Sequence, residues 1–344
     1  MAGSNEVRVD MSSQDSALDH FLTSHGLRQA GETAIWTPLT GGVSSDIWRV
    51  DLPGRTLCVK RALPQLKVAA DWHAPVSRNA YEWAWLQFAA QHCPQNVPRP
   101  VAHDADAGLF AMEFLDPQDH PAWKTQLLAG TVQPATAAAV GDVLGRLHQE
   151  SAGRSDLAAA FDSESNFYAL RLEPYLVTAA KRHPEAADAL LGLAQRTAQA
   201  RVALVHGDVS PKNILVGPNG PVILDAECAW YGEPAFDVAF CLNHLLLKSI
   251  AQPSQADALR SSFDLLRSAY LARVSWEARD ELERRAAALL PGLLLARCDG
   301  KSPVEYLVRE KDRARIRAVT IPLLLESPAA LAAVADAWFS AATS

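Results

Sequence analysis

The chain has 344 residues, 49% apolar and 21% charged, which is enough for a large core in two domains or lobes and excludes a small disulfide-held scaffold. Its 32 basic and 39 acidic residues give a net charge of −7, which disfavours nucleic acid and anionic membranes as partners. Five widely spaced cysteines without a Cys-x-x-Cys pair indicate reduced thiols. No apolar stretch reaches the roughly 20 residues of a membrane span. We therefore expect a cytoplasmic protein without a membrane partner.

The first predicted elements form a small β-rich lobe. We expect residues 1–35 to be an N-terminal helical extension. Residues 36–60 hold two strand-like pieces around a Pro-Gly turn, which is typical of a hairpin. Residues 78–92 have helical spacing, and residues 109–115 indicate a further strand. This lobe is expected to span residues 36–115.

Helices dominate the rest of the chain. Two short strand candidates, at 213–217 and 221–225, interrupt them around a Pro-Asn-Gly turn. The predicted helical segments are 135–151, 185–202, 255–296 and 303–338. The sequence therefore predicts an α+β fold with a larger, mainly helical lobe over residues 116–344 and a hinge near residues 112–117.

The most informative stretch is residues 204–227, LVHGDVSPKNILVGPNGPVILDAE. Asp208 lies in a His-Gly-Asp turn, Asn213 follows five residues later, and Asp225 ends the second strand candidate. Phosphoryl transfer from a nucleotide needs a carboxylate that orients the attacking hydroxyl and oxygen ligands that hold magnesium. A lone His-Gly-Asp is a common turn, but the three residues with a hairpin between them predict such a site.

Further features follow in the order that such a site requires. Gly41 and Gly42 lie between strand-like pieces and would let backbone N–H groups approach phosphates, although a hairpin turn would look the same. Strand alternation places Cys58 and Lys60 on one face, with Lys60 able to reach phosphates and Cys58 able to cover a base. Glu82 on the next helix is a candidate partner of Lys60, with a solvated helix carboxylate as the alternative.

Two further segments complete this pattern. Residues 111–115, AMEFL, form an extended strand whose backbone could bind an adenine edge, although a plain connecting strand would look the same. Asp237 lies in the apolar segment WYGEPAFDVAF, where a carboxylate costs free energy unless it is hydrogen-bonded. We interpret it as a brace for the loop from His206 to Asn213.

Together these segments resemble the aminoglycoside phosphotransferase and choline kinase superfamily of small-molecule kinases. The resemblance rests on TGGVSSDIWRV, LGRLH, HGDVSPKN, ILDAE and GEPAFDVAF, in this order, and covers residues 36–245. It implies a protein-kinase-like fold of two lobes, with a nucleotide-binding N-lobe and ATP and Mg²⁺ as cofactors. Residues 204–227 would be the catalytic loop, and residues 241–344 a helical substrate-binding subdomain.

The resemblance also implies roles for individual residues. Asp208 would be the catalytic carboxylate, Asn213 and Asp225 the magnesium ligands, and His206 and Asp237 structural residues of the catalytic loop. The residues expected to bind ATP are Gly41, Gly42, Ser44, Ser45, Lys60, Glu82, Glu113 and Leu115.

Some positions depart from protein kinases. Those enzymes carry Arg after the loop His and Lys two residues after the Asp, whereas this chain has Gly207 and Ser210, which speaks against a protein substrate. The pair of Asp225 and Glu227 is similar to the choline kinase and methylthioribose kinase branches. Strand alternation would put both on one face, so Glu227 would contact substrate or a second metal, unless it is a solvated carboxylate.

The last hundred residues are expected to determine the acceptor. Residues 241–344 hold 14 basic and 12 acidic side chains, a balance that disfavours a polycationic antibiotic. Ser302 and Glu305 have capping-box spacing around Pro303, which predicts a helix start. With Arg297 and Lys301 nearby, this start would bind an anionic or heavily hydroxylated substrate, unless it is merely a capped surface helix.

The sequence thus predicts an ATP- and Mg-dependent phosphotransferase that acts on a hydroxyl group of a small metabolite, such as a sugar derivative or an amino alcohol. One alternative is an antibiotic-resistance kinase for aminoglycosides or macrolides. Another is a nucleotide-binding pseudokinase module. The acceptor, the choice between ATP and GTP, and the oligomeric state stay open.

Overall fold

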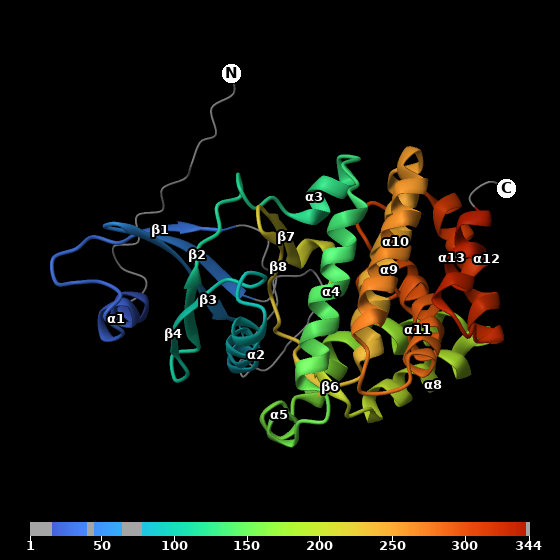
Figure 1. The fold of residues 1–344 in the computed structure, drawn as a ribbon, viewed down its shortest axis with the longest axis horizontal. Coiled ribbons are helices and arrows are strands. Elements are labelled where there is room, and N and C mark those ends of the chain that lie inside the picture. The colour runs from blue at the N-terminus through green and yellow to red at the C-terminus, as the bar shows by residue number, and fades with distance from the viewer. Residues whose placement is uncertain (1–15, 40–44, 64–77, 342–344) are drawn as a thin grey trace.

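The computed structural model describes residues 16–39, 45–63 and 78–341. A five-stranded sheet with two helices forms one end of the molecule, here called the sheet region, and helices form most of the remainder, the helical region (Figure 1). The elements of the sheet region are α1 (Ser16–Ser24), β1 (Ile35–Pro38), β2 (Ser45–Leu52), β3 (Arg55–Ala62), α2 (Arg78–His92), β4 (Pro100–Asp104) and β5 (Leu109–Glu113).

All strand pairs of this sheet are antiparallel, in the order β1-β2-β3-β5-β4. Alternation along β3 sends its side chains to opposite faces. Leu57 and Val59 pack in a buried cluster with Phe21 of α1, whereas Lys60 lies on the opposite face, toward the helical region. The predicted hairpin, the helix at 78–92 and the alternation of this strand are confirmed.

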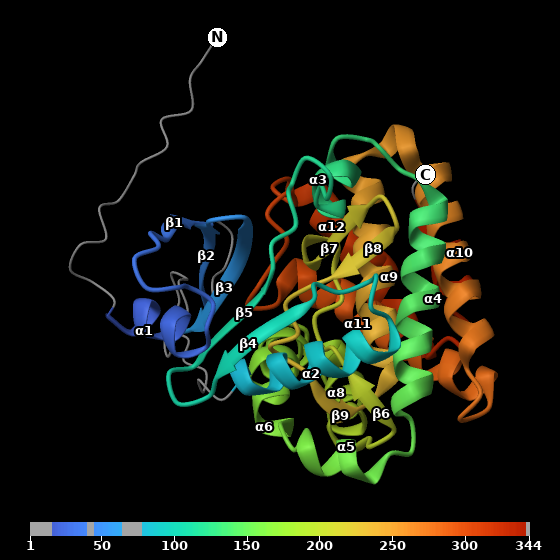
Figure 2. The same ribbon diagram turned by 60° about the vertical axis from the view of Figure 1, so that its left-hand side comes forward.

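The helical region contains the predicted helices and the predicted hairpin of β7 and β8. Figure 2 shows α4 and α10 side by side, the hairpin of β7 and β8 next to α4, and β6 and β9 near α5, α6 and α8. Its helices are α3 (Trp123–Leu128), α4 (Pro134–Ser151), α5 (Ser155–Ala160), α6 (Glu164–Phe167), a π-helix (Tyr168–Val177), α7 (Thr178–Arg182), α8 (Ala187–Gln199), α9 (Pro234–Ala251), α10 (Ala256–Arg273), α11 (Arg279–Asp299), α12 (Glu310–Glu326) and α13 (Leu331–Ser340). Short 3-10 turns occur at Pro184–Ala186, Pro211–Asn213 and Pro253–Gln255. Its strands are β6 (Ala203–Val205), β7 (Ile214–Gly217), β8 (Gly220–Ile223) and β9 (Trp230–Gly232).

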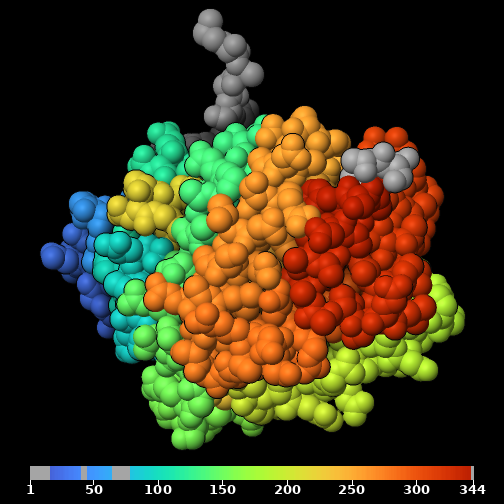
Figure 3. All heavy atoms as spheres, turned by 45° about the vertical axis from the view of Figure 1, so that its right-hand side comes forward, coloured from blue at the N-terminus to red at the C-terminus, as the bar shows by residue number. Residues whose placement is uncertain are grey.

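The main hydrophobic core surrounds α9, in which every residue from Pro234 to Ile250 is buried. The last helices of the chain, in orange and red, form most of the face shown in Figure 3. Helices α4 and α10 approach closely because α4 has Gly141 where a Cβ atom would lie 2.3 Å from the carbonyl oxygen of Leu266. This core gives the loop between β6 and β7 a rigid support.

The predicted α+β architecture of a small β-rich part and a larger helical part is confirmed. One local expectation is wrong, because no helix begins near Pro303 and α12 begins only at Glu310. The domain boundaries at residues 35, 115 and 240 stay predictions. Within the described ranges, no helix combines the length and the apolar character that a membrane crossing requires.

Candidate active site

Asp237 of α9 supports the loop that follows β6. This buried carboxylate accepts hydrogen bonds from the backbone N–H of His206 at 2.7 Å and of Gly207 at 2.8 Å. Gly207 has φ +79°, and a Cβ atom there would lie 2.7 Å from the carbonyl oxygen of Cys228. Both the backbone conformation and the close approach therefore require glycine at this position. These are the contacts that a brace of the loop would make.

His206 links the same loop to the end of β8. Its Nδ1 accepts a hydrogen bond from the backbone N–H of Asp208 at 3.1 Å, which leaves the proton on Nε2. Nε2 in turn donates to the carbonyl of Leu224 at 3.0 Å, next to Asp225. Burial lowers the pKa of His206, which keeps the ring neutral. His206 therefore connects the backbone at Asp208 to the backbone next to Asp225 and adds no charge to the site.

Asp208 is buried among cationic and amide groups. Its Oδ2 lies 2.8 Å from Arg171 Nη2 and 3.1 Å from Lys212 Nζ, and it accepts a hydrogen bond from Asn213 Nδ2 at 2.9 Å. Burial alone would raise the pKa of this carboxyl, but the charges of Arg171 and Lys212 outweigh burial and hold the pKa below its usual range. Within the described ranges no protein group donates to Oδ1. Asp208 thus has an ionised carboxylate with one oxygen available.

A second charged cluster lies on the facing side of the loop. Lys60 Nζ donates to Glu82 Oε1 at 2.7 Å, and it also forms an ion pair with Asp225. The predicted pairing of Lys60 with Glu82 is therefore present. Burial alone would lower the pKa of Lys60. The charges of Asp225 and Glu82 outweigh burial and raise the pKa above its usual value, so the lysine stays protonated. Burial raises the pKa of Glu82 to about 7 despite the opposing effect of Lys60.

These groups line a cavity of about 420 Å³ between the sheet region and the helical region, here called the sheet-side cavity. Most of the predicted nucleotide and metal residues lie on its wall. The lining residues are Leu39, Ile47, Cys58, Lys60, Glu82, Pro98, Met112, Glu113, Phe114, Leu115, Pro117, Lys212, Asn213, Leu215, Leu224 and Asp225.

The remaining predicted nucleotide residues differ in position. Gly41, Gly42 and Ser44 lie outside the described residues. Ser45 is the first residue of β2 and is buried, but it is not part of the cavity lining.

The segment after β5 forms the edge of this cavity. The N–H of Glu113 donates to the carbonyl of Arg99 at 2.9 Å. No carbonyl of the described residues accepts from the N–H of Leu115. Of the two residues expected to offer backbone contacts to a base, Glu113 therefore has an engaged N–H, whereas the N–H of Leu115 is available within the described residues.

Asn213 and Asp225 fit the ligand chemistry of magnesium. The Nδ2 atom of Asn213 is engaged by the carbonyl oxygen and Oδ2 of Asp208, which leaves its amide oxygen as the atom for a cation. Asp225 supplies a carboxylate, and the charges of Lys60 and Lys212 hold its pKa below the usual range against the effect of burial. Magnesium is commonly held by one or two such side chains together with phosphate oxygens and waters.

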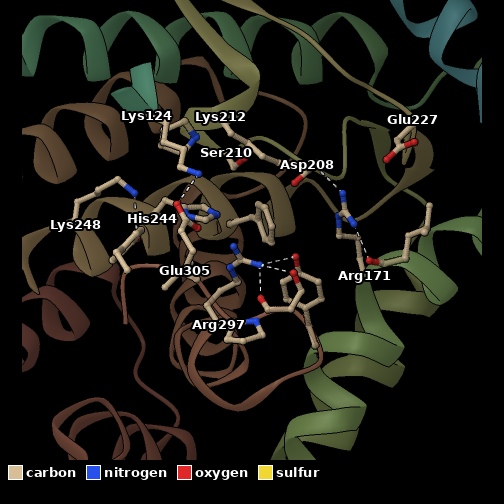
Figure 4. Close-up of a pocket in the computed structure, with 18 residues that line it drawn as sticks. Lys124, Arg171, Asp208, Ser210, Lys212, Glu227, His244, Lys248, Arg297 and Glu305 are labelled. Atoms are coloured by element: carbon tan, nitrogen blue, oxygen red, sulfur yellow. Dashed lines mark hydrogen bonds and ion pairs between the residues drawn. The ribbon is translucent and has the colours of Figure 1, made fainter. Parts of the chain in front are cut away.

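A second cavity of about 310 Å³, here called the helix-side cavity, lies on the other side of Asp208 (Figure 4). Lys212 lines both cavities, whereas Asp208 lines only this one. Its wall comes from distant parts of the helical region. The lining residues are Lys124, Leu170, Arg171, Tyr175, Asp208, Ser210, Pro211, Lys212, Glu227, Phe240, His244, Lys248, Arg297, Ser302, Pro303, Val304, Glu305 and Tyr306.

Several of these residues were not found from the sequence. Arg171, on the π-helix, also donates from Nε to the carbonyl of Gly207 at 2.7 Å, but no motif surrounds it in the sequence. Lys248 is a charged residue in the buried apolar run LNHLLLKSIA of α9, and His244 precedes it by one turn. A lysine in such a run was the available signal, because a buried charge needs a partner.

Glu227 lines the helix-side cavity, but the reason given for it was wrong. Strand β8 ends at Ile223, and Asp225 has φ +67°, so Asp225 and Glu227 do not alternate along a strand. Glu227 is instead buried and accepts from Arg78 Nε of α2 at 3.2 Å.

Arg297 and Lys301 separate in the structure. Arg297 lines the helix-side cavity and donates from Nη1 to the carbonyl oxygen of Ser302 at 2.5 Å and to its hydroxyl at 3.1 Å. This contact uses the hydroxyl that would have capped a helix, which explains why no helix starts at Pro303. Lys301 is exposed and is not part of the cavity lining.

Comparison with known proteins agrees with this geometry. The model of the phosphotransferase enzyme family matches residues 35–274. Among characterised relatives, methylthioribose kinase of Pectobacterium atrosepticum is 27% identical over 223 residues, covering 57% of this chain and 55% of the relative. That of Erwinia tasmaniensis is 29% identical over 224 residues, with the same shares of 57% and 55%. The chain therefore spans about half the length of the curated relatives it matches.

Solved structures show the same fold at low identity. A choline/ethanolamine kinase family protein from Mesorhizobium loti superposes with a TM-score of 0.50 at 16% identity, over 93% of this chain and 97% of that one. An amicoumacin kinase, solved with AMP-PNP and Ca²⁺, gives 0.55 at 16% identity over 94% and 96%. A putative aminoglycoside phosphotransferase from Ralstonia eutropha gives 0.51 at 16% identity over 95% and 97%.

Proposed function

Because the chain belongs to the phosphotransferase enzyme family, we propose that it transfers the γ-phosphoryl group of ATP, with Mg²⁺, to a hydroxyl group of a small metabolite. The observation that carries this proposal is that two cavities meet at the loop from Asp208 to Asn213. The sheet-side cavity would hold the nucleotide and the helix-side cavity the acceptor. Lys212, which lines both, lies where the phosphoryl group would pass.

On the donor side, Lys60 would fix the phosphates of the nucleotide. Glu82 holds its ammonium group at 2.7 Å, so the lysine is already oriented before a nucleotide arrives. Leu115 would donate its backbone N–H to the base, and Cys58 would contact the base from the sheet. Mg²⁺ held by Asn213 and Asp225 would supply charge neutralisation at the phosphates.

On the acceptor side, Asp208 would orient the attacking hydroxyl. Its Oδ2 is fixed by Arg171, Lys212 and Asn213, and the free Oδ1 would accept the hydroxyl proton. The acceptor oxygen would form its bond to the γ-phosphorus as the bond from that phosphorus to the bridging oxygen breaks and ADP leaves. The cations around Oδ2 also keep the carboxylate ionised, as an acceptor of that proton must be.

Two observations favour a sugar derivative over an aminoglycoside. The chain's curated relatives are named methylthioribose kinases, which supports an acceptor of the sugar type. The helix-side cavity is lined by five basic side chains and three carboxylates, which would repel a polycationic drug.

The test is an ATP-consumption screen of the purified full chain against sugars, sugar derivatives, amino alcohols and aminoglycosides, with Asp208→Asn as the blank. We expect turnover with one acceptor class and a loss of about 10³-fold in the variant, because removing a general base typically costs 10²- to 10⁴-fold. Titration with a fluorescent ATP analogue should show retained nucleotide binding. Near-normal turnover of Asp208→Asn would contradict the mechanism, and nucleotide binding without turnover on any acceptor would favour a pseudokinase module.

A further inference from the structure

The charges that line the helix-side cavity do not balance. Five basic side chains face three carboxylates, and each carboxylate already has its own cationic partner. Asp208 is held by Arg171 and Lys212, and Glu227 accepts from Arg78, which lies outside the cavity lining. The remaining pair is Glu305 with Lys124, at 2.6 Å.

Two cations are left without a counter-charge, namely Lys248 and Arg297. No carboxylate of residues 16–39, 45–63 or 78–341 lies within ion-pair distance of either group. Lys248 Nζ donates to the hydroxyl of Tyr306 at 3.1 Å and lies 4.1 Å from the centre of its ring. Arg297 Nη1 donates to the hydroxyl of Tyr175 at 3.1 Å. Lys248 is almost fully buried, so its charge is costly unless an anion binds there.

Buried polar groups without hydrogen-bond partners also line this cavity. His244 Nε2 has no hydrogen-bond partner, although the residue is only 6% exposed. It precedes Lys248 by four residues on α9, so the two side chains share one face of the helix. Ser210, beside Asp208, likewise has a buried hydroxyl without a partner. Buried polar groups are usually hydrogen-bonded in folded proteins, so these two side chains are available to bind a ligand in the cavity that they line.

We propose that Lys248, Arg297 and His244 form an anion-binding subsite in the helix-side cavity, and that the acceptor is therefore a hydroxylated anion, either a carboxylate or a phosphate ester. Figure 4 shows Lys248 and His244 across the cavity from Asp208. The anionic group would bind at this wall while a hydroxyl group of the same molecule reaches Asp208. This inference rests on the proposed phosphotransferase function and adds the charge of its acceptor.

The electrostatics of Lys248 support this arrangement. Burial lowers its pKa to about 7, and the neighbouring cations Lys124 and Arg297 add to this effect while Glu305 opposes it. Burial and the same cations also hold the pKa of His244 well below its usual value, so the ring is neutral and one of its two nitrogens carries a proton that it can donate. A bound anion would supply the counter-charge that stabilises protonated Lys248. The same anion would accept a hydrogen bond from the imidazole of His244.

The first experiment measures binding by isothermal titration calorimetry, so that it does not depend on turnover. The probes are hydroxycarboxylates and sugar phosphates of four to six carbons, such as D-ribonate and D-ribose 5-phosphate. Each anion is compared with a neutral and a cationic counterpart. For D-ribonate and D-ribose 5-phosphate, the neutral counterpart is D-ribitol and the cationic counterpart is 1-amino-1-deoxy-D-ribitol. We expect at least one anion to bind tenfold or more tighter than its neutral counterpart. Preference for ribonate or for the phosphate tells the two anion types apart.

The variant Lys248→Met keeps the length of the buried side chain but removes its charge. We expect it to weaken anion binding at least tenfold, whereas Lys248→Arg should restore most of it. Lys311→Met, on an exposed position of α12, is the matched control and should bind anions like the parent chain. Thermal unfolding of all three variants separates lost binding from lost folding.

The outcomes distinguish the subsite from the proposed function. Anion binding that depends on Lys248, without ATP consumption on any acceptor, keeps the subsite and defeats the phosphotransferase proposal. ATP consumption with a neutral or cationic acceptor preferred over its anionic counterpart keeps the enzyme and overturns the subsite. The subsite is also overturned if no anion binds better than its neutral counterpart, or if Lys248→Met binds anions as the parent does.

Discussion

The two cavities that meet at Lys212 differ in how their lysines are paired. In the sheet-side cavity, Lys60 is paired with both Glu82 and Asp225, so this cation has its counter-charges within the protein. In the helix-side cavity, Lys248 and Arg297 have no carboxylate partner among the described residues. A cation that is paired within the protein is held in place before a ligand arrives, whereas a buried cation without a counter-charge is stabilised by an anionic ligand. Under the proposed function, this contrast predicts a preformed nucleotide site in the sheet-side cavity and an acceptor site in the helix-side cavity that selects by charge.

The largest effect that would test this contrast is expected from Lys60→Met. The variant removes the cation that would bind the phosphates and leaves two carboxylates beside them. A hydrogen bond to a charged group contributes about 1.5–3 kcal/mol, so we expect kcat/KM for ATP to fall about 100-fold. Anion binding in the helix-side cavity should stay unchanged in calorimetry.

The corresponding control is the double variant Lys60→Met/Lys248→Met. Since the two lysines share no partner, their effects on kcat/KM should add in free energy. A strong departure from additivity, with thermal unfolding unchanged, would show that the two cavities do not act independently.

A smaller effect that should distinguish the two cavities is the dependence of the acceptor KM on pH. Lys248 has a pKa lowered to about 7, and Tyr306, Glu305, Lys124, Arg297 and His244 surround it. Its protonated form is the one that binds an anion, and this form is lost as the pH rises above about 7. The acceptor KM should therefore rise up to about tenfold per pH unit between pH 7 and pH 9.

The control for this pH effect is the same profile in Lys248→Met, which should be flat over that range. A profile of Lys248→Met that parallels the parent would assign the titration to another group. The KM for ATP, measured in the same series, is expected to change little, since Lys60 stays protonated over this range.

The sequence predicted the sheet-side cavity far better than the helix-side cavity. Asn213 and Asp225, which line this cavity, lie within one short segment together with Asp208, and from their spacing the sequence predicted a site for a nucleotide and a metal. Arg171 and Lys248 come from separate helices and enter the cavity only through tertiary packing. No motif surrounds Arg171, and the apolar run around Lys248 indicates a buried charge but not the cavity that this charge lines.

The tail shows why local signals failed where tertiary contacts compete. Ser302, Pro303 and Glu305 have the spacing of a helix start, yet Arg297 binds Ser302 and α12 begins only at Glu310. A balance of 14 basic and 12 acidic residues over 241–344 indicated only a slight basic excess. The structure concentrates unpaired cations from that region at one wall, which composition alone does not reveal.

Gly141→Ala is expected to have the smallest effect on ligand binding in either cavity, although it should lower the stability of the fold. A Cβ atom at this position would lie 2.3 Å from the carbonyl oxygen of Leu266, and neither backbone can move without separating α4 from α10. Such overpacking typically costs about 1–3 kcal/mol, so chemical denaturation should show a loss of stability of this size.

The control is Gly192→Ala on α8. A Cβ atom there would meet only the tip of Arg196 at 3.2 Å, so the variant should leave stability unchanged or slightly raised. Because Gly141 lines neither cavity, the KM values for ATP and acceptor should stay within about twofold of the parent. A selective change in acceptor KM alone would mean that α4 and α10 set the geometry of the helix-side cavity.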